Sequence, residues 1–105
     1  MFYELRQYTI TPGKMDEWVT LMEQAIIPFQ IAQGMVITGS FREEDDTRYI
    51  WTRRFESEAE REDLYEAVYG SDTWKEEIAP RIRGLIATDG VKVQRIVPTP
   101  KSVTQ

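Results

Sequence analysis

Four segments of the chain have the side-chain pattern of β-strands. Residues 2–10 and 48–55 mix aromatic, branched and charged side chains with a period of two, which is typical of a strand with one buried face. Shorter runs of the same kind cover residues 35–41 and 91–97. A charged turn at residues 43–46 separates the second run from the third, so these two predict a β-hairpin.

A long amphipathic helix is predicted between the first and second strands. From Met15 to Phe29 the apolar residues recur at the three- and four-residue spacing of one helix face. Thr11 suits the N-cap, and Pro12 suits the first helical position. Pro28 is expected to kink or end the helix, because proline lacks the backbone N–H that a helix interior uses.

A second helix is predicted after the third strand. Ser57 and Glu60 have the spacing of a capping box, in which the serine is the N-cap. The helix is expected to reach about Tyr69 and to stop at Gly70. Tyr65 and Tyr69 lie four residues apart and therefore form an aromatic pair on one face of this helix.

The order of these elements, βαββαβ, predicts a ferredoxin-like α+β fold. Such a fold has a four-stranded antiparallel sheet with both helices on one face. The 105 residues are enough for one domain of this size. We place this domain at residues 1–98 and expect residues 99–105 to form a C-terminal tail, because the prolines at 98 and 100 end regular structure.

The sheet face opposite the helices would be left uncovered. On the third strand this face carries Ile50 and Thr52 between two arginines. An exposed apolar sheet face needs a cover, and a second copy of the same sheet supplies one in a two-fold dimer. We therefore expect a homodimer with a sheet-to-sheet interface.

The composition excludes several classes of chemistry. The chain has no cysteine and no histidine, which rules out disulfides, thiolate nucleophiles, Cys/His zinc sites, histidine bases and histidine-ligated haem. The net charge of −5 argues against binding to nucleic acid or to an anionic membrane surface. No cofactor motif is present, and the acidic turn at residues 43–46 lacks the ligand spacing of a calcium loop, so no cofactor or metal is expected. With no apolar span and no signal-like N-terminus, the cytoplasm is the expected location.

One cluster of charged and aromatic residues is a candidate site. The first and third strands are central neighbours in a ferredoxin-like sheet, so Glu4, Arg6 and Arg53 would be buried under the helices if their faces coincide. Buried charges must pair, and Glu4 is expected to pair with one of the two arginines. Two interpretations remain: a purely structural bridge, or charges at the mouth of an aromatic pocket that orient a small ligand. The residues assigned to this candidate pocket are Glu4, Arg6, Tyr8, Trp51, Arg53, Phe55 and Trp74.

The sequence resembles the NIPSNAP family from Phe2 to about Pro100. The residues that carry the resemblance, in order, are Glu4-Leu5-Arg6, Tyr8, Pro12-Gly13-Lys14, Trp18, Pro28, Gly34, Gly39, Phe41, Trp51, Ser57, Arg61, Trp74 and Pro98-Thr99-Pro100. The resemblance implies membership of the dimeric α+β barrel superfamily, in which two ferredoxin-like sheets face each other. Animal members of the family are mitochondrial, and their roles depend on a presequence and on partner-binding segments that this sequence does not show.

The same superfamily includes antibiotic-biosynthesis-type monooxygenases, which hold substrate between the sheet and the helices. Its haem-degrading members use Asn, Trp and His there. The corresponding positions in this sequence fall on Arg6, Phe55 and Ile78, so the comparison implies that haem is not degraded. The location of the pocket still carries over as an expectation, and it coincides with the cluster found from strand alternation.

Three functions remain open from the sequence. The first is a dimeric protein that binds a small apolar or anionic ligand without catalysis. The second is a cofactor-independent enzyme, similar to a monooxygenase or an isomerase, on a small aromatic substrate. In it Arg6 or Arg53 would stabilise an oxyanion and Glu4 would assist proton transfer. The third is a protein-interaction module that presents the acidic residues between positions 43 and 77 to a basic partner.

Overall fold

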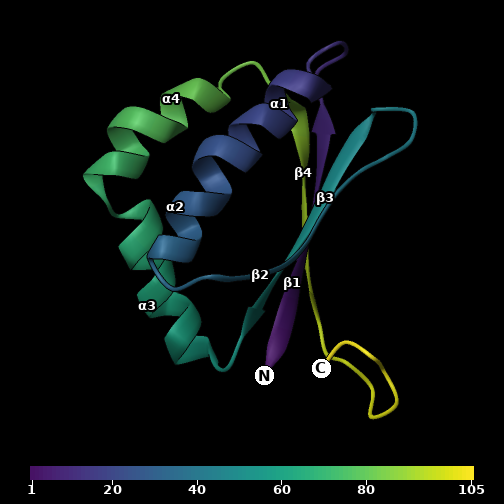
Figure 1. The fold of residues 1–105 in the computed structure, drawn as a ribbon, viewed down its shortest axis with the longest axis vertical. Coiled ribbons are helices and arrows are strands. Elements are labelled where there is room, and N and C mark those ends of the chain that lie inside the picture. The colour runs from purple at the N-terminus through teal and green to yellow at the C-terminus, as the bar shows by residue number, and fades with distance from the viewer.

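The computed structural model describes all 105 residues, and its main feature is a four-stranded antiparallel sheet with every helix on one face (Figure 1). The strand order is β2-β3-β1-β4. The elements are β1 (Phe2–Ile10), α1 (Met15–Leu21), the π-helical turn η1 (Met22–Ile26), α2 (Ile27–Ala32), β2 (Val36–Arg42), β3 (Arg48–Phe55), α3 (Glu58–Tyr69), the π-helical segment η2 (Thr73–Ile78), α4 (Ala79–Ile82) and β4 (Ile86–Ile96). This arrangement confirms the predicted ferredoxin-like fold.

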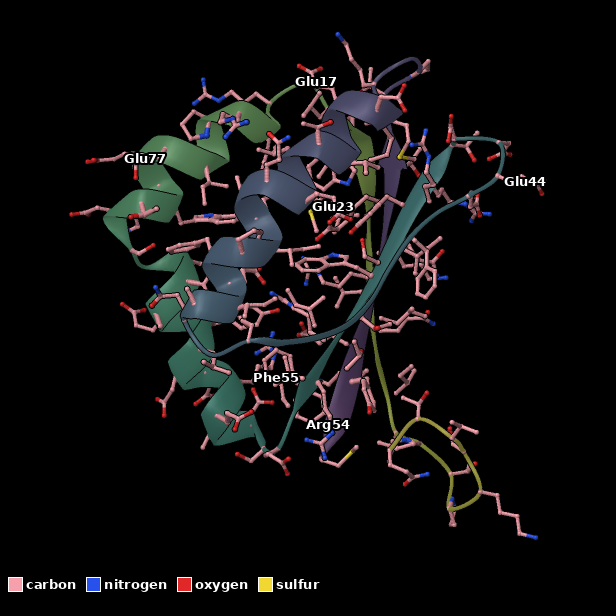
Figure 2. The ribbon with its side chains drawn as sticks, in the orientation of Figure 1. Glu17, Glu23, Glu44, Arg54, Phe55 and Glu77 are labelled. Atoms are coloured by element: carbon pink, nitrogen blue, oxygen red, sulfur yellow. The ribbon has the colours of Figure 1, made fainter.

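The two central strands, β1 and β3, determine which side chains meet beneath the helices. Their antiparallel register places Glu4 opposite Arg53 and Arg6 opposite Trp51. Directly opposed residues project from the same face of a sheet. The Glu4–Arg53 pair therefore lies beside the Arg6–Trp51 pair on the helix side. Adjacent residues project from opposite faces: Phe55 is fully buried on the helix side, and Arg54 lies half-buried on the other side (Figure 2).

The larger part of the core lies between the sheet and the first helical segment, and a group of aromatic rings forms its centre. The rings of Tyr8, Trp18 and Tyr49 contact one another, with centroids 5.5 to 6.3 Å apart. A smaller cluster of Met35, Phe55 and Val68 closes the end near α3. Burial of one such side chain contributes roughly 1.5–3 kcal/mol, so these contacts are the main force that holds the helices on the sheet.

The first helical segment differs from its prediction at its N-terminal boundary. Thr11 is not the N-cap; the helix begins at Met15 after a turn in which the Lys14 amide donates to the Thr11 carbonyl. Gly13 has a φ of +80° in this turn, a conformation that cannot continue a right-handed helix. Pro28 does not end the helix, which continues to Ala32. It follows the π-helical turn η1 and sits in the first turn of α2, where its missing N–H does little harm.

The second helix follows its prediction closely. The Ser57 hydroxyl accepts the Glu60 amide at 3.1 Å, and α3 ends at Tyr69 with Gly70 as its C-cap. The Glu60 carboxylate accepts the amide of Glu56 at 3.2 Å, one residue earlier than a standard capping box would have it. Both bonds fix the point at which the chain leaves β3 and turns over the sheet.

The last strand begins earlier than predicted. β4 starts at Ile86 rather than Val91 and ends at Ile96, so Val97 lies outside it. Residues 86–90 lack alternation, and Asp89 adopts a φ of 57°, so the pairing with β1 shifts register there. The side-chain pattern of residues 86–90 therefore does not predict a strand, although they form the start of β4.

The C-terminal loop folds back onto the sheet face opposite the helices. It lies at the same end of the sheet as the N-terminus (Figure 1), where the backbone carbonyl of Gln105 accepts hydrogen bonds from Tyr3 Oη and Arg54 Nε. The loop covers Tyr3, while Phe41 and Ile96 on the same face stay exposed. Among the helices, none combines the length and the apolar character needed to cross a bilayer.

Candidate functional site

A cavity of about 250 Å³ lies between the sheet and the helices. Eleven of its twelve lining residues are hydrophobic. They come from both central strands, from β4 and from every helical segment except α2. The lining residues are Arg6, Tyr8, Trp18, Met22, Ile26, Trp51, Tyr65, Tyr69, Trp74, Ile82, Ile86 and Val91. All three tryptophans of the chain belong to this set.

Four of the seven residues assigned from sequence line this cavity. They are Arg6, Tyr8, Trp51 and Trp74. Phe55 does not; it packs with Met35 and Val68 in the second core cluster. Glu4 and Arg53 also lie outside the cavity lining, in a buried hydrogen-bond network behind it. The structure therefore separates the candidate site into a cavity and a supporting network.

Several lining residues were not assigned to the pocket from sequence. Trp18, Met22 and Ile26 are spaced four residues apart along the first helical segment. Tyr65 and Tyr69 have the same spacing on α3. This periodicity is a visible signal of one helix face, but it does not say which sheet residues that face meets.

The buried network is centred on the ion pair between Glu4 and Arg53. Their side chains are 1% and 0% exposed, and Arg53 Nη2 donates to Glu4 Oε1 at 2.7 Å. Arg53 Nη1 donates to Gln30 Oε1 at 2.9 Å and to the Tyr69 hydroxyl at 2.7 Å. The guanidinium also lies over the Trp51 ring, 4.8 Å from its centroid. One side chain thus links both central strands to α2 and α3.

The Glu4 carboxylate is saturated with donors. Arg61 Nε donates to Oε2 at 2.8 Å, and the Tyr65 hydroxyl lies 2.8 Å from Oε1 and 2.9 Å from Oε2. Burial by itself would raise the pKa of Glu4, but the hydrogen bond from Arg61, the charge of Arg53 and the Tyr65 hydroxyl outweigh it and hold the pKa below its ordinary value. The carboxylate is therefore ionised, and its partners are Arg53, Arg61 and Tyr65.

Arg6 and Tyr8 form the polar end of the cavity. The Tyr8 hydroxyl accepts Arg6 Nε at 2.8 Å and Trp51 Nε1 at 3.0 Å. Arg6 Nη1 lies 3.4 Å from the Tyr65 hydroxyl and 3.9 Å from Glu4 Oε1, so its contact with the carboxylate is weaker than those of Arg53 and Arg61. Arg6 is the one charged residue that lines the cavity.

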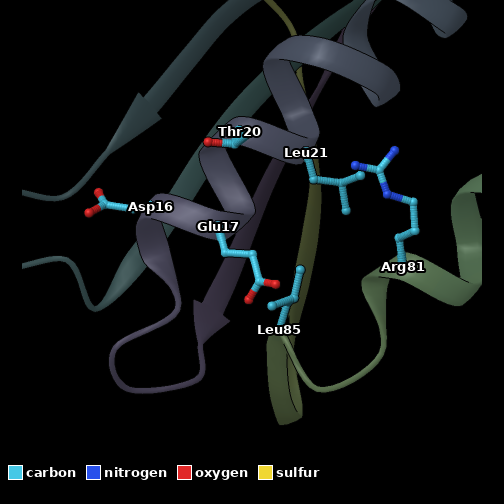
Figure 3. Close-up of a pocket in the computed structure, with 6 residues that line it drawn as sticks. All are labelled: Asp16, Glu17, Thr20, Leu21, Arg81 and Leu85. Carbon is cyan, nitrogen blue, oxygen red and sulfur yellow. The ribbon is translucent and has the colours of Figure 1, made fainter.

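A larger hollow of about 410 Å³ lies on the outside of the molecule between α1 and α4 (Figure 3). Only two of its six lining residues, Leu21 and Leu85, are hydrophobic. The Asp16 carboxylate at its rim is paired with Arg42 at 2.9 Å, and Glu17 lies 3.8 Å from Lys14. Ligand sites are mostly apolar with a few convergent polar groups, and the smaller inner cavity fits that description better.

The sequence matches a known family, and the fold matches several solved structures. The NIPSNAP family model matches residues 3–103. A NIPSNAP family protein of unknown function from Agrobacterium tumefaciens superposes with a TM-score of 0.89 at 22% identity, over 100% of this chain and 94% of that one. A second NIPSNAP family protein from the same organism gives 0.87 at 23% identity, over 99% and 98% of the two chains.

The fold extends beyond that family. The crystal structure of an antibiotic biosynthesis monooxygenase superposes with a TM-score of 0.69 at 14% identity, over 95% of this chain and 100% of that one. At this identity the likeness concerns the fold alone. No curated protein matches the sequence.

Proposed function

The chain belongs to the NIPSNAP family, and from that premise we propose that it binds a small, largely aromatic molecule in the cavity between the sheet and the helices. The observation that carries the proposal is the cavity lining. Six of its twelve residues are aromatic, and its polar groups converge at one end, on Arg6 and Tyr8. A concave, mostly apolar space with a few placed polar groups is the usual form of a small-molecule site.

The size of the cavity limits the ligand. An apolar cavity of about 150 Å³ accommodates benzene, and this one measures about 250 Å³. We therefore expect a ligand with one or two fused rings. Edge-to-face contacts with Trp18 and Trp74 would hold such rings in place.

Binding without catalysis is preferred over the enzymatic alternative. No carboxylate lines the cavity, and Glu4 is held by Arg53, Arg61 and Tyr65 outside it. The proton-transfer group that the enzymatic alternative assigned to Glu4 is therefore missing from the place where it would act.

The test is calorimetric titration with 2-naphthol on the wild type and on two matched variants. Val91 lines the cavity and Val93 does not, although both lie on β4, face the helix side and are about half exposed, at 52% and 44%. Val91→Phe should weaken binding by about tenfold or more, because the added ring fills space that the ligand needs. Val93→Phe should leave it within about twofold. Absence of wild-type binding, or equal effects of the two variants, would refute the proposal.

We also propose that two copies associate through the sheet face opposite the helices. Val36, Phe41 and Ile96 on this face are 48%, 60% and 43% exposed, and Leu5 and Ile50 lie half-buried between them. A second copy of the face would cover these residues symmetrically. Interfaces of this kind bury roughly 1,600 Å² in total, which a four-stranded face can supply.

The association is tested by light scattering coupled to size exclusion. Phe41→Asp places a charge in the proposed interface and should shift the mass toward the monomer. Val93→Asp places the same charge at an exposed apolar position on the other face of the sheet and should leave the mass unchanged. A monomeric wild type, or a Phe41→Asp dimer, contradicts the proposal.

A further inference from the structure

The Tyr8 hydroxyl has an unused hydrogen. Its oxygen accepts two N–H donors, Arg6 Nε at 2.8 Å and Trp51 Nε1 at 3.0 Å. A phenol oxygen has two acceptor positions and one donor hydrogen. Both acceptor positions are occupied, and no acceptor within the chain takes the hydrogen. Because Tyr8 lines the cavity, this hydrogen is a donor available to a ligand.

Two further cavity residues have the same property. The Tyr69 hydroxyl accepts Arg53 Nη1 at 2.7 Å and Gln30 Nε2 at 3.3 Å, and its hydrogen has no acceptor within the chain. The indole nitrogen of Trp18, which can only donate, is buried without any partner, in a side chain 1% exposed. The unpartnered polar groups of these cavity residues are thus all donors.

The charge around the cavity points in the same direction. Three guanidinium groups, those of Arg6, Arg53 and Arg61, surround the single carboxylate of Glu4. Arg53 and Arg61 bond it at 2.7 and 2.8 Å, whereas Arg6 stands 3.9 Å away. Arg6 Nη2 has no hydrogen-bond partner in the chain, and no carboxylate lines the cavity. The polar end of the cavity is therefore positive and rich in donors.

We infer that the ligand carries an anionic oxygen, a carboxylate or the enolate or phenolate of a fused-ring system, and that this oxygen sits against Tyr8 and Arg6. The inference rests on the proposed function and adds the chemical class of the ligand. An oxyanion accepts from the hydroxyl and the guanidinium at once, and such charge-assisted bonds are stronger than neutral ones. A cationic ligand would meet Arg6 and would find no acceptor to bond.

The test compares three probes with the same ring system: 2-naphthoate, 2-naphthol and 2-naphthylmethylammonium. Calorimetry at neutral pH and fixed salt should rank the carboxylate at least about tenfold tighter than the ammonium, with the naphthol between them. If the ammonium binds as tightly as the carboxylate, the inference is wrong while the proposed function stands. If none of the three binds, the proposed function fails and the inference falls with it.

A pair of tyrosine variants locates the oxygen. Tyr8→Phe removes the donor and should weaken 2-naphthoate by about tenfold or more while leaving the ammonium probe unchanged. Tyr49→Phe is the matched control, because Tyr49 is buried on the same sheet face but bonds Ser40 outside the cavity. It should leave both affinities unchanged. Equal losses in the two variants would refute the placement at Tyr8.

Two additional measurements keep the test decisive if Tyr8→Phe does not fold. Arg6→Gln removes the cation and should reduce the preference for the carboxylate over the ammonium to near unity. In ¹H–¹⁵N spectra the three indole N–H signals report the cavity directly, since all three tryptophans line it. These signals should shift on addition of 2-naphthoate. An unchanged preference in Arg6→Gln counts against the inference.

Discussion

Replacement of Glu4 by glutamine is the sharpest test of the buried network. The substitution keeps the size of the side chain and removes its charge. Arg53 is 0% exposed and would retain its positive charge without a carboxylate partner. Removal of one partner of a buried pair costs about 3–5 kcal/mol. The glutamine carbonyl can still accept one hydrogen bond from Arg53. We therefore expect the free energy of unfolding to fall by about 3 kcal/mol, the lower end of this range.

The free energy of unfolding is measured by urea denaturation at pH 7 and at one protein concentration, since association would make it concentration-dependent. Glu58→Gln is the control. Glu58 also bonds an arginine, Arg95 at 2.6 Å, but both side chains are nearly half exposed, and exposed pairs contribute little. A loss below about 1 kcal/mol in Glu4→Gln, or an equal loss in the control, would refute the central role of the network.

The pH dependence gives a second readout of the same substitution. The pKa of Glu4 is lower in the folded protein than its ordinary value of 4.5. Its contribution to stability is therefore complete above that ordinary pKa and is lost as the pH falls through the folded pKa. Exposed acids such as Asp45 and Glu56, whose pKa values are also lowered, remain in both proteins. The difference in stability between wild type and Glu4→Gln should consequently shrink as the pH is lowered below 4.5; a constant difference contradicts the assignment.

Three further predictions test separate parts of the fold. Ser57→Ala removes the N-cap acceptor of the Glu60 amide and should cost about 1 kcal/mol in urea unfolding; no loss would mean that the cap is dispensable. Gly34→Ala should also destabilise the protein, because Gly34 has a φ of +108° and a Cβ there would lie 3.1 Å from Leu64; a melting temperature equal to that of the wild type contradicts this. Burial raises the pKa of Tyr49 to about 12 and also raises the pKa of Tyr65, so ultraviolet titration should show tyrosines that ionise late, and the amplitude of this late step should fall in Tyr49→Phe.

Strand alternation grouped the charges that lie beneath the helices. The period of two along residues 2–10 and 48–55 predicted that Glu4, Arg6 and Arg53 are buried if the faces of the two strands coincide. The faces do coincide, and Glu4 and Arg53 are buried, whereas Arg6 is only half-buried. Alternation did not reveal Arg61, which reaches Glu4 from α3. Such a contact depends on how the helix packs across the sheet. The side-chain period of a strand contains no information about the distance between the strand and the helix.

The residues assigned to the candidate pocket from sequence divide between two parts of the structure. Trp51 and Trp74 line the cavity, whereas Phe55 lies in the second core cluster. The strand period gives the face of a residue but not its position along the length of the helices above it. The start of β4 was missed for a related reason: Ile86 and its neighbours pair with β1 across a register shift, where the period of two is interrupted.

The span of the Arg53 network in sequence has a consequence for the order of folding. This one guanidinium bonds partners that lie 49, 23 and 16 residues away along the chain. All these bonds require β1, β3, α2 and α3 to be docked, because each partner comes from a different element. Contacts that close so many loops at once form late. Loss of Glu4 should therefore increase the unfolding rate and leave the refolding rate nearly unchanged. The network thus contributes to the kinetic stability of the native state, because it slows unfolding.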